Sequence, residues 1–125
     1  MTNSWPQIYR PHLIDCRFKK NKIMLLVEQD RNNYFLSFEN IRKFNVNNAR
    51  QVECELMEYI EKPSANVVLN MDEIAFIDSS AFETLLNVLR MAKINNTAFH
   101  LGSVSDEAME LIRLMELDKV FTFSN

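Results

Sequence analysis

Glycine is almost absent from this chain of 125 residues, since Gly102 is the only one. A glycine-rich phosphate-binding loop is therefore excluded, because such a loop needs several glycines to bring its backbone close to a phosphate. No apolar run approaches the roughly 18 residues that cross a bilayer, so no membrane span is expected. The N-terminus lacks the charged start and apolar core of a secretory signal, and we expect a cytoplasmic protein.

Residues that hold metals or act as nucleophiles are also few. His12 and His100 lie far apart and lack ligand spacing, and no group of cysteine and histidine suggests zinc. Cys16 and Cys54 have no motif spacing, and reduced thiols are their simplest interpretation. The G-x-S-x-G elbow of nucleophilic hydrolases is missing. We therefore expect no metal, no cofactor and no enzymatic activity.

The charge is nearly balanced, with 14 Lys and Arg, 17 Asp and Glu and a net charge of -3. Nucleic-acid binding usually requires a basic patch. The nearest approach is a group that fits the solvated face of a strand better, namely Arg17, Lys19, Lys20 and Lys22. An apolar content of 47% and a charged content of 25% are typical of a globular domain, and the length suits one domain. No nucleic-acid partner is expected.

Apolar periodicity divides most of the chain into alternating strands and helices. Strands are expected at 22–29, 34–38, 66–69, 97–101 and 120–123, and helices at 49–61, at 81–93 and from a cap at Ser105-Asp106 to Met115. The first two strands form a hairpin around a turn rich in Asn and Asp. This alternation predicts an α/β domain with parallel connections. Residues 1–21 are expected to form a separate N-terminal arm, in which 13–18 alternate like a short strand.

The stretch from Asn66 to Lys93 organises the chain. A buried strand leads through Asp78-Ser79-Ser80 into a helix, whose first amides have no internal partners and attract an oxygen acceptor or a phosphate. Ser80 and Glu83 fit a capping box with Ser80 as N-cap, and Asp78 or Ser79 could share that role. Val88 and Met91 lie off the main apolar stripe of this helix and are expected to be exposed.

These residues resemble a known family. Asn-Val-Val-Leu-Asn at 66–70, followed by Ile-Ala-Phe-Ile-Asp-Ser-Ser at 74–80, resembles the signature of STAS domains, the anti-sigma factor antagonists and their relatives. The strand at 97–101, the helix at 104–115 and the closing segment at 116–121 are also similar to that family. The resemblance covers 22–125. It implies one small STAS-type domain with a mixed sheet of four or five strands and helices mainly on one face.

The resemblance also implies a site. In this family a partner kinase phosphorylates the first serine after the aspartate, which is Ser79 here. The implied partner surface comprises Asn70, Asp72, Asp78, Ser79, Ser80, Ala81 and Glu83, of which Ala81 replaces the family's usual glycine. Structural interpretations remain open for several of them: Ser79 as a helix cap, Asp78 as a turn residue bonded to local amides, and Asn70 and Asp72 as turn residues.

The function that the resemblance implies is protein binding. An anti-sigma factor antagonist captures an anti-sigma factor, often a serine kinase-like protein, and so frees a sigma factor for transcription in bacteria. Phosphorylation of Ser79 would release the partner. One alternative is a constitutive STAS subunit of a transporter or signalling assembly, and a second is a nucleotide or small-ligand sensor. The N-terminal arm is expected to pack on the domain or on a second copy, which would make a homodimer.

Overall fold

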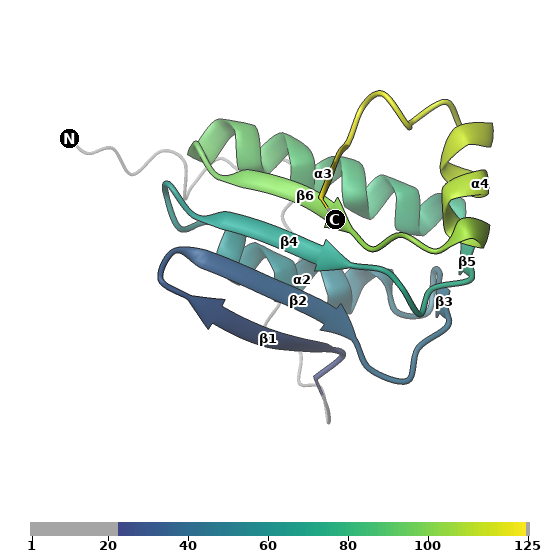
Figure 1. Cartoon of the computed structure of the whole chain (residues 1–125), viewed down its shortest axis with the longest axis horizontal. Coiled ribbons are helices and arrows are strands. Elements are labelled where there is room, and N and C mark those ends of the chain that lie inside the picture. Colours follow the sequence, from purple (N-terminus) through teal and green to yellow (C-terminus); the bar gives the residue numbers. More distant parts are fainter. Residues whose placement is uncertain (1–22, 125) are drawn as a thin grey trace.

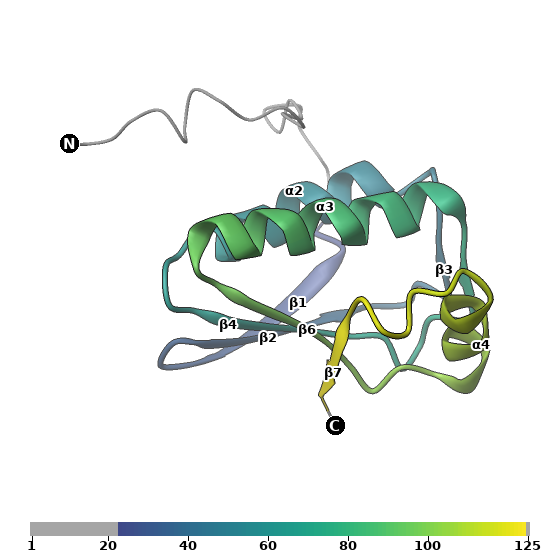
Figure 2. The same cartoon turned by 90° about the horizontal axis from the view of Figure 1, so that it is seen from above.

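The computed structural model describes residues 23–124, in which two helices lie on one face of a five-stranded sheet (Figures 1 and 2). The predicted arm at 1–21, with its short strand, lies outside the described residues. The elements are β1 (Leu25–Asp30), β2 (Asn33–Phe38), β3 (Lys43–Phe44), α2 (Ala49–Ile60), β4 (Asn66–Asn70), β5 (Phe76–Ile77), α3 (Ser79–Asn95), β6 (Ala98–Gly102), α4 (Asp106–Leu114) and β7 (Thr122–Ser124).

The main sheet has the order β1-β2-β4-β6-β7. β1 and β2 are antiparallel and form the predicted hairpin, whereas the other neighbours are parallel. Parallel neighbours need crossover connections, and α2 and α3 supply two of them. The predicted mixed sheet, with helices mainly on one face, is therefore confirmed (Figure 2). The last strand, expected at 120–123, is also present as β7.

Alternation along the strands directs side chains to the helices. In β2, Tyr34, Leu36 and Phe38 are buried, and in the central strand Val67 and Leu69 are completely buried. Successive side chains of a strand point to opposite faces, so this pattern places one apolar row of each strand beneath α2 and α3. The core therefore lies between the sheet and the helix pair. α4 stands apart at the end of the sheet, beside β5 (Figure 1).

The helix α3 buries a wider face than its apolar stripe predicts. Val88 is 0% exposed and Met91 is 7% exposed, so the expectation that both are exposed is wrong. They share a helical face with Thr84, at spacings of four and seven residues, and the Thr84 hydroxyl contacts α2. α3 thus packs against the sheet on one side and against α2 on another, which buries residues off the main stripe.

The shortage of glycine is met by other residues with positive φ. Asn96 ends α3 at φ 60°, and its N–H donates to the carbonyls of the last turn. Asn40 adopts φ 61° just after β2. Asparagine tolerates this left-handed region better than most residues. The other non-glycine residues with positive φ among those described are Arg31, Ser64, Ser103 and Glu116.

The expectation of reduced thiols is wrong for one cysteine. Cys54, in α2, is buried and disulfide-bonded. The other cysteine of the sequence, Cys16, lies outside the described residues.

Candidate functional site

A second, two-stranded sheet holds the segment that leads into α3. β3 and β5 run parallel, with Phe44 opposite Ile77. Phe44 is completely buried, and its ring packs against that of Phe38 with centroids 5.2 Å apart. The Asp78 amide donates to the Phe44 carbonyl at 3.2 Å. The start of α3 is therefore attached to the hydrophobic core through β3.

Asp78 is the N-cap of α3 and has an extended backbone, with φ -99° and ψ -177°. Its Oδ1 accepts from the Ala81 N–H at 2.9 Å, and its Oδ2 accepts from the Val46 N–H at 2.9 Å. Its carbonyl accepts from the Phe82 N–H at 3.0 Å. Both carboxylate oxygens thus bind the chain's own backbone. Asp78 fixes the position of Ser79, the first residue of the helix.

The predicted capping box is therefore wrong. Ser80 lies inside the first turn of α3, and Glu83 is exposed and does not cap it. A cap must have a non-helical backbone and reach the amide three residues on, and Asp78 does both. The second carboxylate oxygen of Asp78 also accepts from the Val46 N–H. Of the interpretations of Asp78, the structure shows the one in which its carboxylate accepts from a local amide, the Ala81 N–H.

The two serine residues in the first turn of α3 differ in how exposed they are. Ser79 is exposed, Ser80 is half-buried and Ala81 is 0% exposed. The methyl group that distinguishes Ala81 from glycine is in the core, so Ala81 cannot belong to the predicted partner surface. Ser79 is thus the accessible hydroxyl at the start of the helix.

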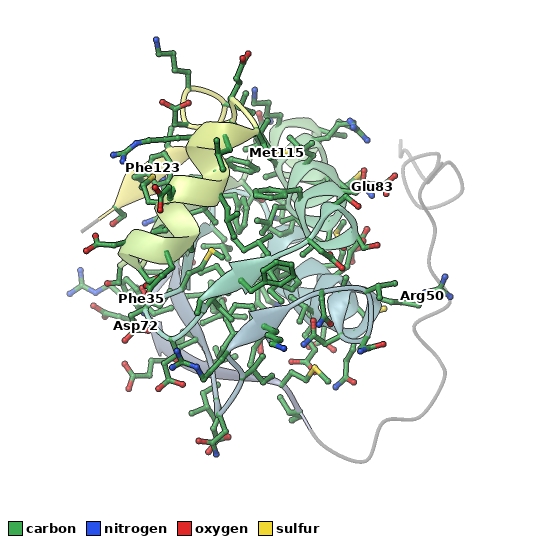
Figure 3. All side chains as sticks on the ribbon, turned by 90° about the vertical axis from the view of Figure 1, so that its right-hand side faces the viewer. Phe35, Arg50, Asp72, Glu83, Met115 and Phe123 are labelled. Carbon is green, nitrogen blue, oxygen red and sulfur yellow. The ribbon has the colours of Figure 1, made fainter. Side chains whose placement is uncertain are left out.

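Two of the predicted site residues, Asn70 and Asp72, lie outside α3, the helix that carries Ser79 and Glu83. Asn70, at the end of β4, is half-buried, and a Cβ on Gly102 would lie 2.6 Å from its Oδ1. Asp72 is exposed and lies on the opposite side of the molecule from Glu83 of α3 (Figure 3). Ser79 and Glu83 thus belong to the helix side, and Asp72 belongs to the far side of the sheet.

An asparagine-rich loop between β3 and α2 presents the Val46 N–H to the Asp78 carboxylate. The Asn45 N–H donates to Asn48 Oδ1 at 3.0 Å, and the Asn47 N–H donates to Asn45 Oδ1 at 3.0 Å. Asn48 Nδ2 donates to the Lys43 carbonyl at 2.9 Å. These bonds shape the loop so that the Val46 N–H reaches Asp78. Asn48 is the N-cap of α2, although its side chain bonds this loop instead of the helix.

Two apolar side chains beside the site were not predicted. Val46 is 65% exposed and Phe76 is 44% exposed. The Val46 N–H binds the carboxylate of Asp78, the residue before Ser79. Phe76 lies in β5, two residues before Asp78. Val46 is 32 residues from Asp78 in sequence, and no local pattern links the two. Exposed apolar groups beside polar ones are typical of a protein-binding surface.

A buried carboxyl group lies in the seam between α2 and α3. Glu53 is 4% exposed, and its Oε1 accepts from the Thr84 hydroxyl at 3.2 Å. Its removal from water raises the pKa of Glu53 to about 6, and the Glu83 charge adds to this. Hydrogen bonds from Thr84 and Asn87 and the charge of Arg50 oppose the rise in pKa. Glu83 and Arg50 both lie on the helix side (Figure 3).

Metal and membrane sites were sought over the part of the chain that the structure describes. Within residues 23–124, no group of three or more His, Cys, Asp and Glu could hold a metal ion. None of the helices described there is both long and apolar enough to cross a bilayer. Neither result bears on residues 1–22.

Removal of the Asp78 carboxylate should loosen the start of α3. We expect Asp78→Ala to lower the free energy of unfolding by about 1–3 kcal/mol, because the Ala81 and Val46 amides lose their acceptor. Asp78→Asn keeps one acceptor oxygen and should lose less. Urea unfolding followed by circular dichroism measures both. Ser80→Ala is the control and should change stability by no more than about 0.5 kcal/mol; an equal loss in it would contradict the assignment of the cap.

The order of elements and the start of α3 can now be compared with known proteins. The sequence matches the STAS domain family over residues 26–125. The chain belongs to the STAS domain family. The resemblance seen in the Asp78-Ser79-Ser80 segment is thereby confirmed, and so is the STAS-type fold.

Solved structures of STAS proteins share this fold. An anti-sigma-factor antagonist (STAS) domain protein from Planctomyces limnophilus is 19% identical, with a TM-score of 0.71 over 81% of this chain and 90% of that chain. The anti-sigma factor antagonist SpoIIAA in its unphosphorylated form is 14% identical, with a TM-score of 0.65 over 81% of this chain and 88% of that chain. A Ser-to-Glu variant of RsbS from Moorella thermoacetica is 15% identical, with a TM-score of 0.64 over 80% and 85%.

Proposed function

We propose that this STAS domain is an anti-sigma factor antagonist-like regulator that binds a partner protein through the surface around Ser79. The observation that carries the proposal is the exposed Ser79 hydroxyl on a rigidly held helix start. The partner surface in this proposal comprises Ser79, Ser80 and Glu83, with Val46 and Phe76 as apolar contacts. Its structural neighbours include anti-sigma factor antagonists, which supports this choice of partner class.

Phosphorylation of Ser79 is the proposed switch. A phosphate adds a charge of about -1.5 to -2 at neutral pH. The positive end of the α3 dipole tolerates that charge, so the fold is retained. The neighbouring Asp78 carboxylate is bound to two backbone amides, and as an anion it cannot neutralise the charge of the phosphate. A partner that buries Val46 and Phe76 would have to remove water from the phosphate. The free-energy cost of this desolvation would release the partner.

The roles within the proposal follow from this chemistry. The partner is an anti-sigma factor or another serine kinase-like protein, and this chain is its ligand and substrate, not a catalyst. Regulation of transcription by such a pair takes place in the bacterial cytoplasm, where we place the chain. A homodimer through residues 1–21 is a separate proposal, because those residues lie outside the described ones.

A pull-down from the native cell tests the switch, with wild-type, Ser79→Asp and Ser79→Ala baits and identification by mass spectrometry. We expect the wild-type and Ser79→Ala baits to retain a kinase-like anti-sigma factor, and the Ser79→Asp bait to lose it by tenfold or more, since an uncompensated charge at an interface costs at least ~1.4 kcal/mol. Glu58→Gln, an exposed charge on α2 outside the proposed surface, is the charge control and should be retained like the wild type.

Equal retention by all baits would contradict the switch. In that case Ser79 is a structural residue, and the chain is a constitutive docking subunit. An ABC-type ATPase among the retained proteins would favour a transporter assembly.

A further inference from the structure

Exposed apolar side chains gather at the end of α4 and in the segment that follows it. Leu114 is 74% exposed, more than any other large apolar side chain within residues 23–124. Met115, Val120 and Phe123 are exposed as well, so four large apolar side chains at 114–123 face solvent. Single exposed apolar residues are common on protein surfaces, but a group of them is typical of a binding site.

The backbone brings these side chains to one part of the molecule. The Leu117 N–H donates to the Ile112 carbonyl at 3.0 Å, and the Val120 N–H donates to the Leu117 carbonyl at 3.0 Å. The chain therefore turns back directly after α4, which keeps Val120 near the end of the helix. In Figure 3, Met115 and Phe123 both lie beside α4, on the side of the molecule that faces the viewer.

The outward face of α4 combines this apolar group with carboxylates. Ala108 and Ile112 are buried and fix the inner face of the helix. Glu107 and Glu110 are exposed and precede Leu114 by seven and four residues, so the three form one row along the outward face. Glu107 lies in the first turn, where a carboxylate stabilises the helix, but Glu110 lies in the middle of α4, where the helix dipole gives no such reason.

The charge of the whole chain is concentrated here. Residues 105–119 contain five acidic and two basic side chains, a net charge of -3, which equals the net charge of all 125 residues. The surroundings of Leu114 are therefore acidic, whereas the remainder of the chain is neutral in sum. The acidic residues are Asp106, Glu107, Glu110, Glu116 and Asp118.

This charge decides which occupant fits the exposed apolar group. Phosphates make both anionic lipids and nucleic acids negative, so carboxylates around the group repel them. A second copy that docked through the same face would bring like charges together. A protein segment with basic side chains beside an apolar row complements the group in both respects. We propose that the α4 surface, comprising Glu107, Glu110, Leu114, Met115 and Val120, docks a basic amphipathic helix of another protein.

The shape of the α4 surface accounts for a helix as the docked element. Its exposed row follows the axis of α4, and rows of this kind fit between the side chains of a helix that lies alongside. Leu114 and Met115 then contact the apolar side of the docked helix, and Glu107 and Glu110 pair with its Lys or Arg residues. The inference does not rest on the proposed role of Ser79, because the α4 surface and the surface around Ser79 share no residue.

A designed peptide tests the proposal. The probe is a helical peptide of roughly 18 residues that contains only leucine and lysine, with the leucines on one face. Its matched control has glutamate in place of each lysine. Both are titrated into the full chain labelled with 15N, and the amide resonances are followed by NMR. We expect the lysine peptide to shift the resonances of residues 107–120 and the glutamate peptide to leave them in place, because only the lysine peptide complements the acidic surface.

Variants show whether the charge acts locally. The double variant Glu107→Lys, Glu110→Lys should bind the lysine peptide at least ~10-fold more weakly, since it reverses both charges of the row. Glu28→Lys with Asp30→Lys makes the same change of charge on β1, where both residues are exposed, at the opposite edge of the sheet from β7. It should change the affinity by no more than about twofold, because distant exposed charges are screened by salt.

Three results would overturn the proposal: shifts outside residues 107–120, an equal loss of affinity in both double variants, and equal binding of the two peptides. Shifts of the same amides on dilution without peptide would overturn it as well, since a second copy would then cover the α4 surface. Ser79→Asp should leave the affinity for the lysine peptide within about twofold of the wild type. The α4 surface and the Ser79 switch are therefore tested separately.

Discussion

Phe44→Ala should lower the free energy of unfolding by about 3–5 kcal/mol, the usual cost of removing a buried phenylalanine ring. Phe44 is 0% exposed, and its ring packs against Phe38. It is also one of the two residues of β3, the strand that receives the Asp78 amide. The ring therefore connects the hydrophobic core to the start of α3. A domain of this size has a total stability of about 5–15 kcal/mol, so the variant should be close to unfolding.

Chemical denaturation in urea measures this loss, with the tyrosine and tryptophan fluorescence and the circular dichroism followed together. Phe76→Ala is the matched control, since Phe76 belongs to the partner strand β5 but is 44% exposed. It should cost about 1 kcal/mol or less. If the two variants lost the same stability, Phe44 would not be the link between the core and the site.

Glu53→Gln should raise the free energy of unfolding at pH 8 by about 2 kcal/mol. The pKa of Glu53 rises from 4.5 to about 6 because the carboxyl group is removed from water in the seam between α2 and α3. A rise of this size corresponds to about 2 kcal/mol against the charged form in the folded protein. Glutamine has the same shape, can still accept from the Thr84 hydroxyl and carries no charge.

The pH dependence of stability follows from the same shift. Below pH 4.5, Glu53 is protonated in both the folded and the unfolded state, and it carries no penalty. As the pH rises through the window from 4.5 to about 6, the unfolded state loses its proton first, and stability falls. The wild type should therefore lose about 2 kcal/mol across this window relative to Glu53→Gln.

We compare the wild type and Glu53→Gln by unfolding curves at pH values of about 4.5, 5.5, 6.5 and 8, which bracket the shift in the pKa of Glu53. Glu58→Gln is the control, because Glu58 is exposed on the same helix. It should follow the wild type at every pH. A constant difference between wild type and Glu53→Gln would mean that Glu53 does not titrate in this range.

Most of the element order could be predicted because it depends on local patterns. The β1–β2 hairpin follows from two apolar runs around an Asn- and Asp-rich turn, and β4 follows from the run Val67-Val68-Leu69. The short strands β3 and β5 were not predicted as strands. Each contains two residues, too few for any period to appear, and their pairing is decided by the fold around them.

The cap of α3 shows where local reasoning ends. Asp78, Ser79 and Ser80 are all good cap residues, and sequence preference does not separate them. The Val46 N–H needs an acceptor at the same place, and a carboxylate can accept from it while capping the helix. This second demand comes from a residue 32 positions away, so it was invisible in the sequence.

The sequence by itself determined the α/β class, the STAS family and the position of Ser79 at the start of a helix. These properties depend on periodicity, on turn residues and on a contiguous motif, all of which are local. The tertiary structure decided which side chains are accessible at the site. It buried Ala81 and Val88, placed Val46 beside Asp78, and put Asp72 on the far side from Glu83. Accessibility depends on how distant segments pack, and a linear pattern does not encode that packing.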